Sequence, residues 1–253
     1  MSEVIQKQYK PKIKLQIGDN YRFVNNIVKD YNLNTVCAEA NCPNIYECWN
    51  RGTATVMILG DICTRACGFC AVKTGKPTWN DQMEPFRTAM AVKKMNLNHV
   101  VITSVDRDDL KNDFGSSIWA DTINQIHKHV PNCTVEVLTP DFKGHKPSLR
   151  KGFEAKPEIF SHNIECVERI SKKVRSQAVW QRSLDVLKFS VELTVTPDGA
   201  VRTIGLSKSP AGIAPVILLL LTTLNGTETP LTVTFETPER ALPLIEIDCP
   251  CTA

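Results

Sequence analysis

The sequence predicts an α/β fold in which parallel strands alternate with helices, arranged as a partial (β/α) barrel of the TIM type. Two observations carry this prediction. Short apolar, β-branched runs alternate along the chain with longer segments of helical periodicity, which is typical of parallel β/α units. Polar side chains also follow several of these runs directly, as they do at the carboxyl ends of barrel strands, where chemistry takes place.

The elements follow one another in a regular order. Residues 1–34 are basic and polar, and they predict an arm with a short helix near residues 21–30. Buried strands are expected at residues 53–59, 99–105, 134–140 and, as a shorter run, 157–165. Helices are expected at residues 83–97, 116–130, 166–174 and 180–189. Four β/α units are therefore recognisable, and polar stretches follow three of their strands.

Composition divides the chain into three parts. The last part, residues 190–253, carries seven acidic and three basic residues, whereas the rest carries a net charge of +7. All histidines, tryptophans and tyrosines lie before residue 190. We therefore expect an N-terminal extension over residues 1–52, a barrel core over 53–189 and an atypical C-terminal segment over 190–253.

The overall composition excludes several classes of protein. The chain has 253 residues, of which 42% are hydrophobic, which predicts a globular core and argues against disorder. No apolar run is long enough to cross a membrane, and the N-terminus has no secretory signal. We expect a protein of the cytoplasm, where a reducing environment makes clustered cysteines metal ligands or reactive groups rather than crosslinks.

Two cysteine triplets stand out among the ten cysteines. CTRACGFC places Cys63, Cys67 and Cys70 in a C-x3-C-x2-C spacing, just past the first expected strand. Upstream, CAEANCPNIYEC places Cys37, Cys42 and Cys48 in a looser spacing. A [4Fe-4S] cube takes one ligand at each iron, so three cysteines in one loop would leave one iron open to a small molecule.

Other interpretations of the cysteines stay open. A structural zinc site would pair Cys67 and Cys70 with a second C-x2-C or with two spaced histidines, and the sequence contains neither. Disulfides are disfavoured by the expected compartment. Cys133 and Cys166 lie in or beside expected strands and helices, so they are interpreted as small core residues.

These motifs resemble those of the lipoyl synthase family, within the radical S-adenosylmethionine (radical SAM) superfamily. The resemblance rests on both cysteine triplets and on RGTATVMILGD, VVITSVDRDDL, VEVLTPDFKG, FSHNIECV and WQRSLDVLK. It runs from about residue 34 to about residue 187, which is about 60% of the chain. It implies the radical SAM type of partial barrel.

The resemblance also implies an activity, namely insertion of two sulfur atoms at C6 and C8 of a protein-bound octanoyl-lysine. Cys63, Cys67 and Cys70 would hold a [4Fe-4S] cluster that binds S-adenosylmethionine. A second [4Fe-4S] cluster on Cys37, Cys42 and Cys48 would donate the sulfur atoms and be consumed. Such a cofactor is needed because unactivated C–H bonds are beyond the reach of side-chain acids and bases.

Further cofactor-binding residues are expected from matching positions in the motifs. Phe69 would cover the cluster with an apolar side chain, and Thr103 and Ser104 resemble the region that meets the methionyl amine. Asn163 and Glu165, expected to alternate onto one face of a strand, would meet the ribose. Arg182 would pair with the cofactor's carboxylate, unless it is a solvated helix arginine.

The C-terminal segment departs from the family. The family's serine ligand to the second cluster lies in an Arg-Ser-Ser-Tyr stretch, which this sequence lacks, and its later Gly-rich strand is also missing. The departure coincides with the change in composition at residue 190. We interpret the segment as the product of a frameshift, a misjoined exon or a truncated gene; a diverged functional C-terminus is the alternative. Residues 215–221 could supply one more strand.

Partners follow from the resemblance and from charge. The substrates would be octanoylated carrier domains, as in the E2 component of 2-oxoacid dehydrogenases and the glycine cleavage H protein. Lys10, Lys12 and Lys14 are candidates for steering an acidic carrier. A ferredoxin or flavodoxin would donate electrons, and neither nucleic acid nor membrane is expected. Alternatives are another radical SAM enzyme with an auxiliary cluster, or an inactive truncated iron–sulfur protein.

Overall fold

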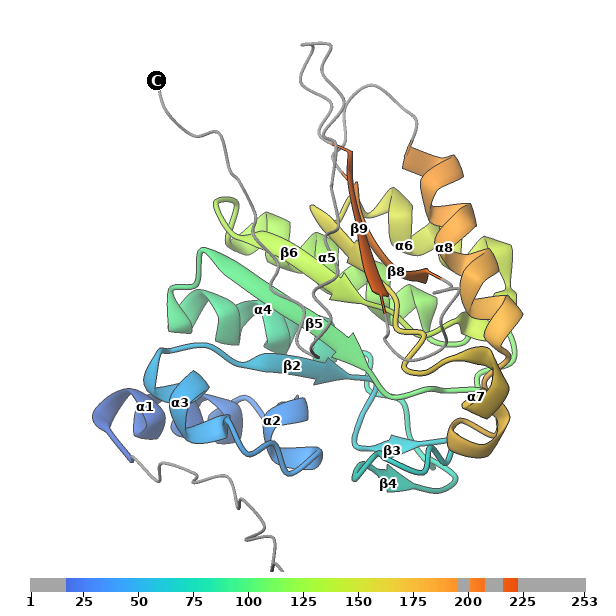
Figure 1. Ribbon diagram of the computed structural model, residues 1–253. Helices are drawn as coiled ribbons and strands as arrows, with labels where there is room; N and C mark the ends of the chain where they lie inside the picture. The colour runs from blue at the N-terminus through green and yellow to red at the C-terminus, as the bar shows by residue number, and fades with distance from the viewer. Residues whose placement is uncertain (1–16, 195–200, 208–215, 223–253) are drawn as a thin grey trace, which may run out of the picture.

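A five-stranded sheet lies at the centre of the computed structural model, which describes residues 17–194, 201–207 and 216–222 (Figure 1). Its strand order is β1-β2-β5-β6-β7. The four parallel strands are β2 (Thr55–Ile58), β5 (His99–Ser104), β6 (Thr134–Leu138) and β7 (Ile159–Ser161). β1 (Asn34–Thr35) pairs antiparallel with β2. The predicted α/β class is confirmed, and the sheet does not close into a barrel within the described residues.

Helices connect the parallel strands, as the sequence predicts for β/α units. α4 (Glu84–Met95) joins β2 to β5, and α5 (Ser116–His129) joins β5 to β6 (Figure 1). A third connecting helix, α6 (Lys146–Glu154), follows the short 3-10 helix η1 (Phe142–Gly144) and was not predicted. Only Ser148 and Leu149 of α6 are buried, so its apolar stripe is too narrow to reveal a helix in the sequence.

The main core lies between the sheet and these helices. Ile102 in the middle strand is fully buried, and Trp119 of α5 is the largest of the fully buried side chains. In β5 and β6 alternate residues join this core, such as Val100 and Ile102, whereas in β2 the consecutive residues 56–58 are all part of it. Ile118, Ile123 and Ile126 are all buried, which confirms the helical periodicity on which the helix at residues 116–130 was predicted.

The N-terminal segment forms a smaller cluster beside the sheet. It contains α1 (Asp19–Asp30), α2 (Val36–Glu39) and α3 (Ile45–Asn50), which lie near β2 (Figure 1). Val24, Ile27 and Trp49 are buried together with Ala91 and Met95 of α4. The helix predicted at residues 21–30 is confirmed. Residues 1–16, with Lys10, Lys12 and Lys14, lie outside the described residues.

The last described elements follow β7. α7 (Glu168–Val174) and α8 (Trp180–Thr194) confirm the two helices predicted there. β8 (Val201–Ser207) and β9 (Val216–Thr222) pair antiparallel with each other, so the strand suggested at 215–221 is present from residue 216. α8 continues past residue 189, and β1 pairs with the central sheet. The predicted domain boundaries stay predictions.

Two smaller observations complete the fold. The cysteine loop contains a short parallel pair, β3 (Ile62–Cys63) and β4 (Lys73–Thr74) (Figure 1). Among the described residues, no helix is long and apolar enough to cross a membrane.

A cavity at the position of Ile102 should destabilise the fold, because this side chain is fully buried in the core. Replacing Ile102 by Ala should lower the free energy of unfolding by about 2–5 kcal/mol, because the removed side chain leaves a void at the centre of the sheet. The matched control is Ile17→Ala, since Ile17 is 56% exposed. Urea denaturation of both variants checks this, and equal losses would contradict the assigned core.

Candidate active site

A cavity of about 500 Å³ opens where the parallel strands end, within the size range of small-molecule sites. Thr55 and Met57 of β2 and Val101 of β5 form part of its floor. Eight of the predicted site residues line it: Cys63, Cys67, Phe69, Cys70, Thr103, Ser104, Asn163 and Glu165. The structure thus brings together side chains from three strand ends and the cysteine loop.

Backbone hydrogen bonds fix Cys63 at the edge of this cavity. Its sulfur accepts N–H groups from Arg65 and Asp106, each at 3.4 Å. Burial, and then the nearby Asp106 carboxylate, raise the pKa of the Cys63 thiol. Burial also raises the pKa of Cys67, against the opposing effect of the Arg175 guanidinium. Both sulfurs therefore favour the thiol in the protein alone, and a bound metal would be needed to hold them as thiolates.

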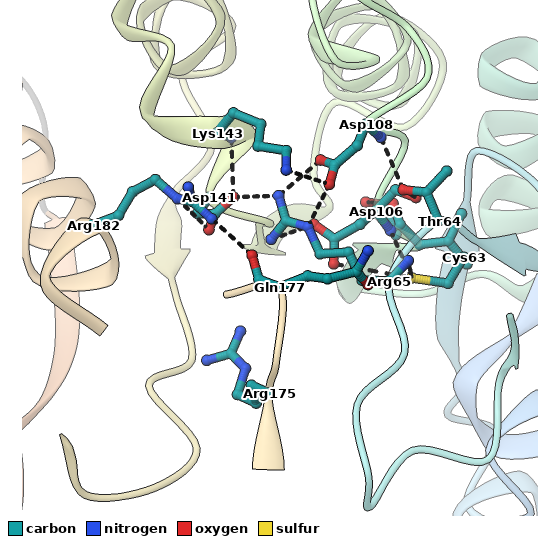
Figure 2. Close-up of polar contacts among 12 residues, drawn as sticks. Cys63, Thr64, Arg65, Asp106, Asp108, Asp141, Lys143, Arg175, Gln177 and Arg182 are labelled. Atoms are coloured by element: carbon teal, nitrogen blue, oxygen red, sulfur yellow. Dashed lines mark hydrogen bonds and ion pairs between the residues drawn. The ribbon is translucent and has the colours of Figure 1, made fainter. Parts of the chain in front are cut away.

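Arg65, between the first two cysteines of the loop, is buried and surrounded by carboxylates (Figure 2). Its Nε and one terminal nitrogen bind both oxygens of Asp108, each at 2.8 Å. Its terminal nitrogens also contact Asp106 at 3.1 Å and Asp141 at 2.6 Å. These aspartates follow β5 and β6, so one guanidinium ties the cysteine loop to two strand ends.

The acidic residues of this network are balanced by three cations. Asp108 also pairs with Lys143 at 2.9 Å, and Asp141 pairs with Arg182 at 2.7 Å (Figure 2). Burial opposes ionisation of Asp141, but Arg65 and Arg182 outweigh it and hold its pKa at about 2. The pKa of Asp106, whose burial outweighs its pairing with Arg65, is raised to about 6.

The turn that leads into the cysteine loop has an unusual backbone. Leu59 and Gly60, which follow β2, have positive φ angles of 70° and 89°. The left-handed region suits Gly60 but is costly for Leu59. Glu84 of α4 is buried and accepts both of their N–H groups, at 2.7 Å and 3.3 Å. A carboxylate from the next helix therefore holds the strained turn in place.

Thr103 and Ser104 lie at the end of β5 with their hydroxyl groups already bonded. The Thr103 hydroxyl donates to the carbonyl of Leu138, at 3.0 Å. The Ser104 hydroxyl donates to the carbonyl of Val105 at 2.9 Å and accepts the Trp119 indole N–H at 3.2 Å. Each hydroxyl oxygen keeps acceptor capacity, so either can still accept a donor from a ligand in the cavity.

Asn163 and Glu165 both line the cavity, but not for the predicted reason. β7 ends at Ser161, so neither residue lies on a strand, and the alternation argument was wrong. Glu165 has a positive φ of 66°, which turns the chain after the strand. Arg175 stabilises this turn by donating to the carbonyls of Asn163 at 3.0 Å and Ile164 at 3.1 Å.

Arg182 lies elsewhere than expected. Its Nε donates to Asp141, and a terminal nitrogen donates to the carbonyl of Gln177 at 3.2 Å. It does not line the described cavity, whereas Arg175 does. In Figure 2 the Arg175 side chain lies apart from the aspartate network that holds Arg182. Arg65 also lines the cavity but is paired with three aspartates. Among the described lining residues, Arg175 is therefore the arginine whose guanidinium is available to a ligand.

The second triplet lies on α2, on α3 and between them. Cys37 is buried in the smaller core, and its carbonyl accepts the N–H of Cys42 at 3.1 Å. Burial, and then the proximity of Cys37 and Cys42, raise the pKa of Cys48. Val36 and Ala40, at the two ends of α2, line the central cavity. The three cysteines themselves are not among the described lining of the cavity; the contribution of this region comes from Val36 and Ala40.

This chain is similar in sequence to known proteins over most of its length. The model of the radical SAM superfamily matches residues 57–209. The chain belongs to the radical SAM superfamily. It is 51% identical to "Lipoyl synthase, mitochondrial" of Nematostella vectensis over 186 residues, 72% of this chain and 64% of that protein. It is 53% identical to "Lipoyl synthase" of Rubrobacter xylanophilus over 182 residues, 72% of this chain and 56% of that protein.

The relatives are longer than the matched region. "Lipoyl synthase" of Flavobacterium johnsoniae is 51% identical over 181 residues, and the match covers 62% of its length. The chain therefore spans less than two thirds of the length of these relatives. Membership of the radical SAM superfamily implies S-adenosylmethionine and an iron–sulfur cluster as cofactors.

The residues present fit these cofactors. All eight cysteines in the described ranges are free thiols, including both triplets. Three buried polar atoms without a described partner belong to cavity-lining residues: Thr139 Oγ1, His162 Nε2 and Arg175 Nε. In the part of the chain that the structure describes, no three acidic, His or Cys side chains converge on one metal ion. A cube places each thiolate on a different iron, so its ligands need not converge on one point.

Sequence reasoning missed several residues of this radical SAM site. Arg65 and Asp141 were not singled out from the sequence. A signal was available, because Arg65 within the cysteine motif and the aspartates after two strands are opposite charges in loops that meet at one edge. Phe69 lines the cavity but is 55% exposed, so it covers little in the protein alone.

Removal of Arg65 should be costly. Arg65→Met would leave Asp106, Asp108 and Asp141 without their shared cation, and we expect a loss of about 3–5 kcal/mol in unfolding free energy. Arg65→Lys should lose less, because it keeps the charge but not the bidentate geometry. The control is Arg22→Met, whose partner Asp19 is fully exposed. Urea denaturation measures all three, and a cost for Arg65→Met no larger than the control's would refute the network's role.

The buried His162 should make the free energy of unfolding depend on pH. Burial lowers the pKa of His162 to about 4, below its ordinary value of about 6.5. The unfolded chain therefore binds a proton that the folded chain does not, and this residue makes stability fall as the pH drops from about 6.5 towards 4. Between pH 8 and pH 5 the wild type should lose about 2 kcal/mol more than His162→Asn. Urea denaturation at both pH values tests this, and parallel losses would contradict it.

Proposed function

We propose that the chain is a lipoyl synthase that inserts two sulfur atoms at C6 and C8 of a protein-bound octanoyl-lysine. The observation that carries the proposal is the position of the first cysteine triplet at the central cavity, with the helix that carries Cys37 contributing to the cavity wall. Cys63, Cys67 and Cys70 line it directly, and α2, which carries Cys37, contributes to its wall through Val36. The relatives named as lipoyl synthases support the same activity.

Cys63, Cys67 and Cys70 would hold a [4Fe-4S] cluster with one iron left for S-adenosylmethionine. When bound, these groups supply a carbon-centred radical able to take hydrogen from an unactivated C–H bond. The protein's own contribution is positional. Arg65 and its carboxylates hold the cysteine loop against the strand ends, and Glu84 holds the turn before it.

The cavity walls would bind the organic part of the cofactor. Thr103 and Ser104 would accept hydrogen bonds from the methionyl amine, and Asn163 and Glu165 would bind the ribose hydroxyls. Arg175, rather than Arg182, would pair with the carboxylate, because it is the guanidinium among the described cavity-lining side chains with an unpaired buried nitrogen. Met57 and Val101 contribute apolar side chains to the lining, which an acyl chain would contact.

Cys37, Cys42 and Cys48 would hold the second [4Fe-4S] cluster, which would donate the sulfur atoms. The missing Arg-Ser-Ser-Tyr stretch favours a second candidate function, because the fourth ligand of that cluster has no counterpart in the sequence. In that case the chain is another radical SAM enzyme with an auxiliary cluster, or an inactive truncated iron–sulfur protein.

Carrier domains bearing octanoyl-lysine, such as those of 2-oxoacid dehydrogenase E2 and of the glycine cleavage H protein, are the proposed substrates. A ferredoxin or flavodoxin would supply electrons, and the cytoplasm is the proposed location. The net charge of +7 on residues 1–189 supports recognition of an acidic carrier.

Single cysteine variants separate the two clusters. The chain reconstituted with iron and sulfide without oxygen should contain about eight irons, four for each cube. Cys63→Ala should lose about four irons and no longer cleave S-adenosylmethionine to 5′-deoxyadenosine. Cys42→Ala should also lose about four, but keep that cleavage while adding no sulfur to an octanoyl-lysine peptide, as measured by mass spectrometry.

The matched control is Cys166→Ala, which should retain all the iron and both activities, because Cys166 is not among the proposed ligands. Wild-type protein with about four irons that cleaves the cofactor but adds no sulfur would favour the second candidate function. Sulfur insertion by Cys42→Ala would exclude the second triplet as sulfur donor.

A further inference from the structure

His162 is a buried residue of the cavity to which the proposed function assigns no role. It follows directly after β7, between Ser161 and the cofactor-binding candidate Asn163. Only 3% of its surface is exposed, yet it belongs to the lining of the central cavity. A histidine in this position is therefore either a satisfied part of the core or a group that meets a ligand.

One ring nitrogen of His162 is bonded to the protein. Nδ1 lies 2.8 Å from the carbonyl oxygen of Thr139, at the end of the neighbouring strand β6. A carbonyl only accepts hydrogen bonds, so Nδ1 carries the hydrogen. Because burial lowers the pKa to about 4, the ring is neutral near pH 7. Nε2 is therefore a bare lone pair that can accept a hydrogen bond but cannot donate one.

The other ring nitrogen has no partner. Nε2 is buried and makes no hydrogen bond within the described residues, and the same is true of the Thr139 hydroxyl. Leaving a buried acceptor unpaired costs stability, and such atoms in native proteins call for a partner. The two orphaned atoms belong to adjacent strand ends that line the same cavity. Their neighbour Arg175 also has an unpaired nitrogen there.

We propose that His162 is a ligand-binding residue whose Nε2 accepts a hydrogen bond from an N–H or O–H group of a molecule bound in the central cavity. The proposal rests on the proposed function, which supplies two sources of that donor. One is the adenosyl group of S-adenosylmethionine, with its exocyclic amine and ribose hydroxyls. The other is the secondary amide N–H of the octanoyl-lysine. Small movements of the imidazole ring or of the ligand would bring Nε2 and the ligand's donor atom together.

Two substitutions separate ligand binding from folding. His162→Asn keeps an N–H near the position of Nδ1, which preserves the bond to Thr139, and removes the acceptor at Nε2. His162→Gln extends a carbonyl oxygen towards the position of Nε2 and serves as the rescue variant. Both are compared with wild type in the full chain, reconstituted without oxygen to equal iron content.

Calorimetric titration with S-adenosylmethionine and, separately, with an octanoyl-lysine peptide distinguishes the sources. We expect His162→Asn to weaken binding of one of the two roughly tenfold, since the ligand's donor is left unpaired, and His162→Gln to recover part of the loss. Loss confined to the cofactor would identify its adenosyl group as the donor, and loss confined to the peptide would identify the amide.

Unchanged affinity of His162→Asn for both probes would overturn the inference and leave Nε2 bonded to an internal water. That result is distinct from a failure of the proposed function. A wild-type chain that binds neither probe would contradict the proposed function itself, and with it the ligands assigned to His162.

Discussion

The site depends on the ion pairs between the buried guanidinium of Arg65 and three carboxylates. A charge removed from water is costly unless it is paired, and Arg65 is paired with three carboxylates at distances of 2.6–3.1 Å. Its partners come from the segments after β5 and β6, so the cysteine loop cannot shift without separating charges in a region of low dielectric. The cysteines are thus held in place by their neighbours in the motif as well as by any cluster.

The elements that the sequence predicted are those with strong local patterns. β5 is a continuous apolar run, and α5 repeats isoleucines on one face, so both were found within a residue or so of their bounds. α6 was not predicted because it buries only two residues. β7 was predicted too long because the residues up to Glu165 continue a pattern typical of a strand. A turn with positive φ at Glu165 ends that pattern, and such a turn has no clear sequence signal without glycine.

The residues of the candidate site were likewise predicted only in part. Motif spacing was enough to place the first cysteine triplet and the residues at the end of β5 at one cavity, because parallel strands end at the same edge. Opposite charges in loops that meet at one edge indicate that arginines and aspartates pair there, but they do not tell which aspartate binds which arginine, since that is set by distances between loops far apart in sequence. Arg182 and Arg175 are both arginines near α7 and α8, but Asp141 binds the first and leaves the second to the cavity.

The described lining of the cavity comes from the part of the chain that resembles its relatives. All of its described lining lies between Val36 and Arg175, whereas the resemblance ends at about residue 187. The aspartate network closes with Arg182, also before that point. The residues proposed to bind S-adenosylmethionine therefore lie in the part of the chain that resembles the family, whereas the proposed fourth ligand of the second cluster has no counterpart in the sequence. The two halves of the proposed reaction, radical formation and sulfur transfer, thus have separate structural requirements in this chain.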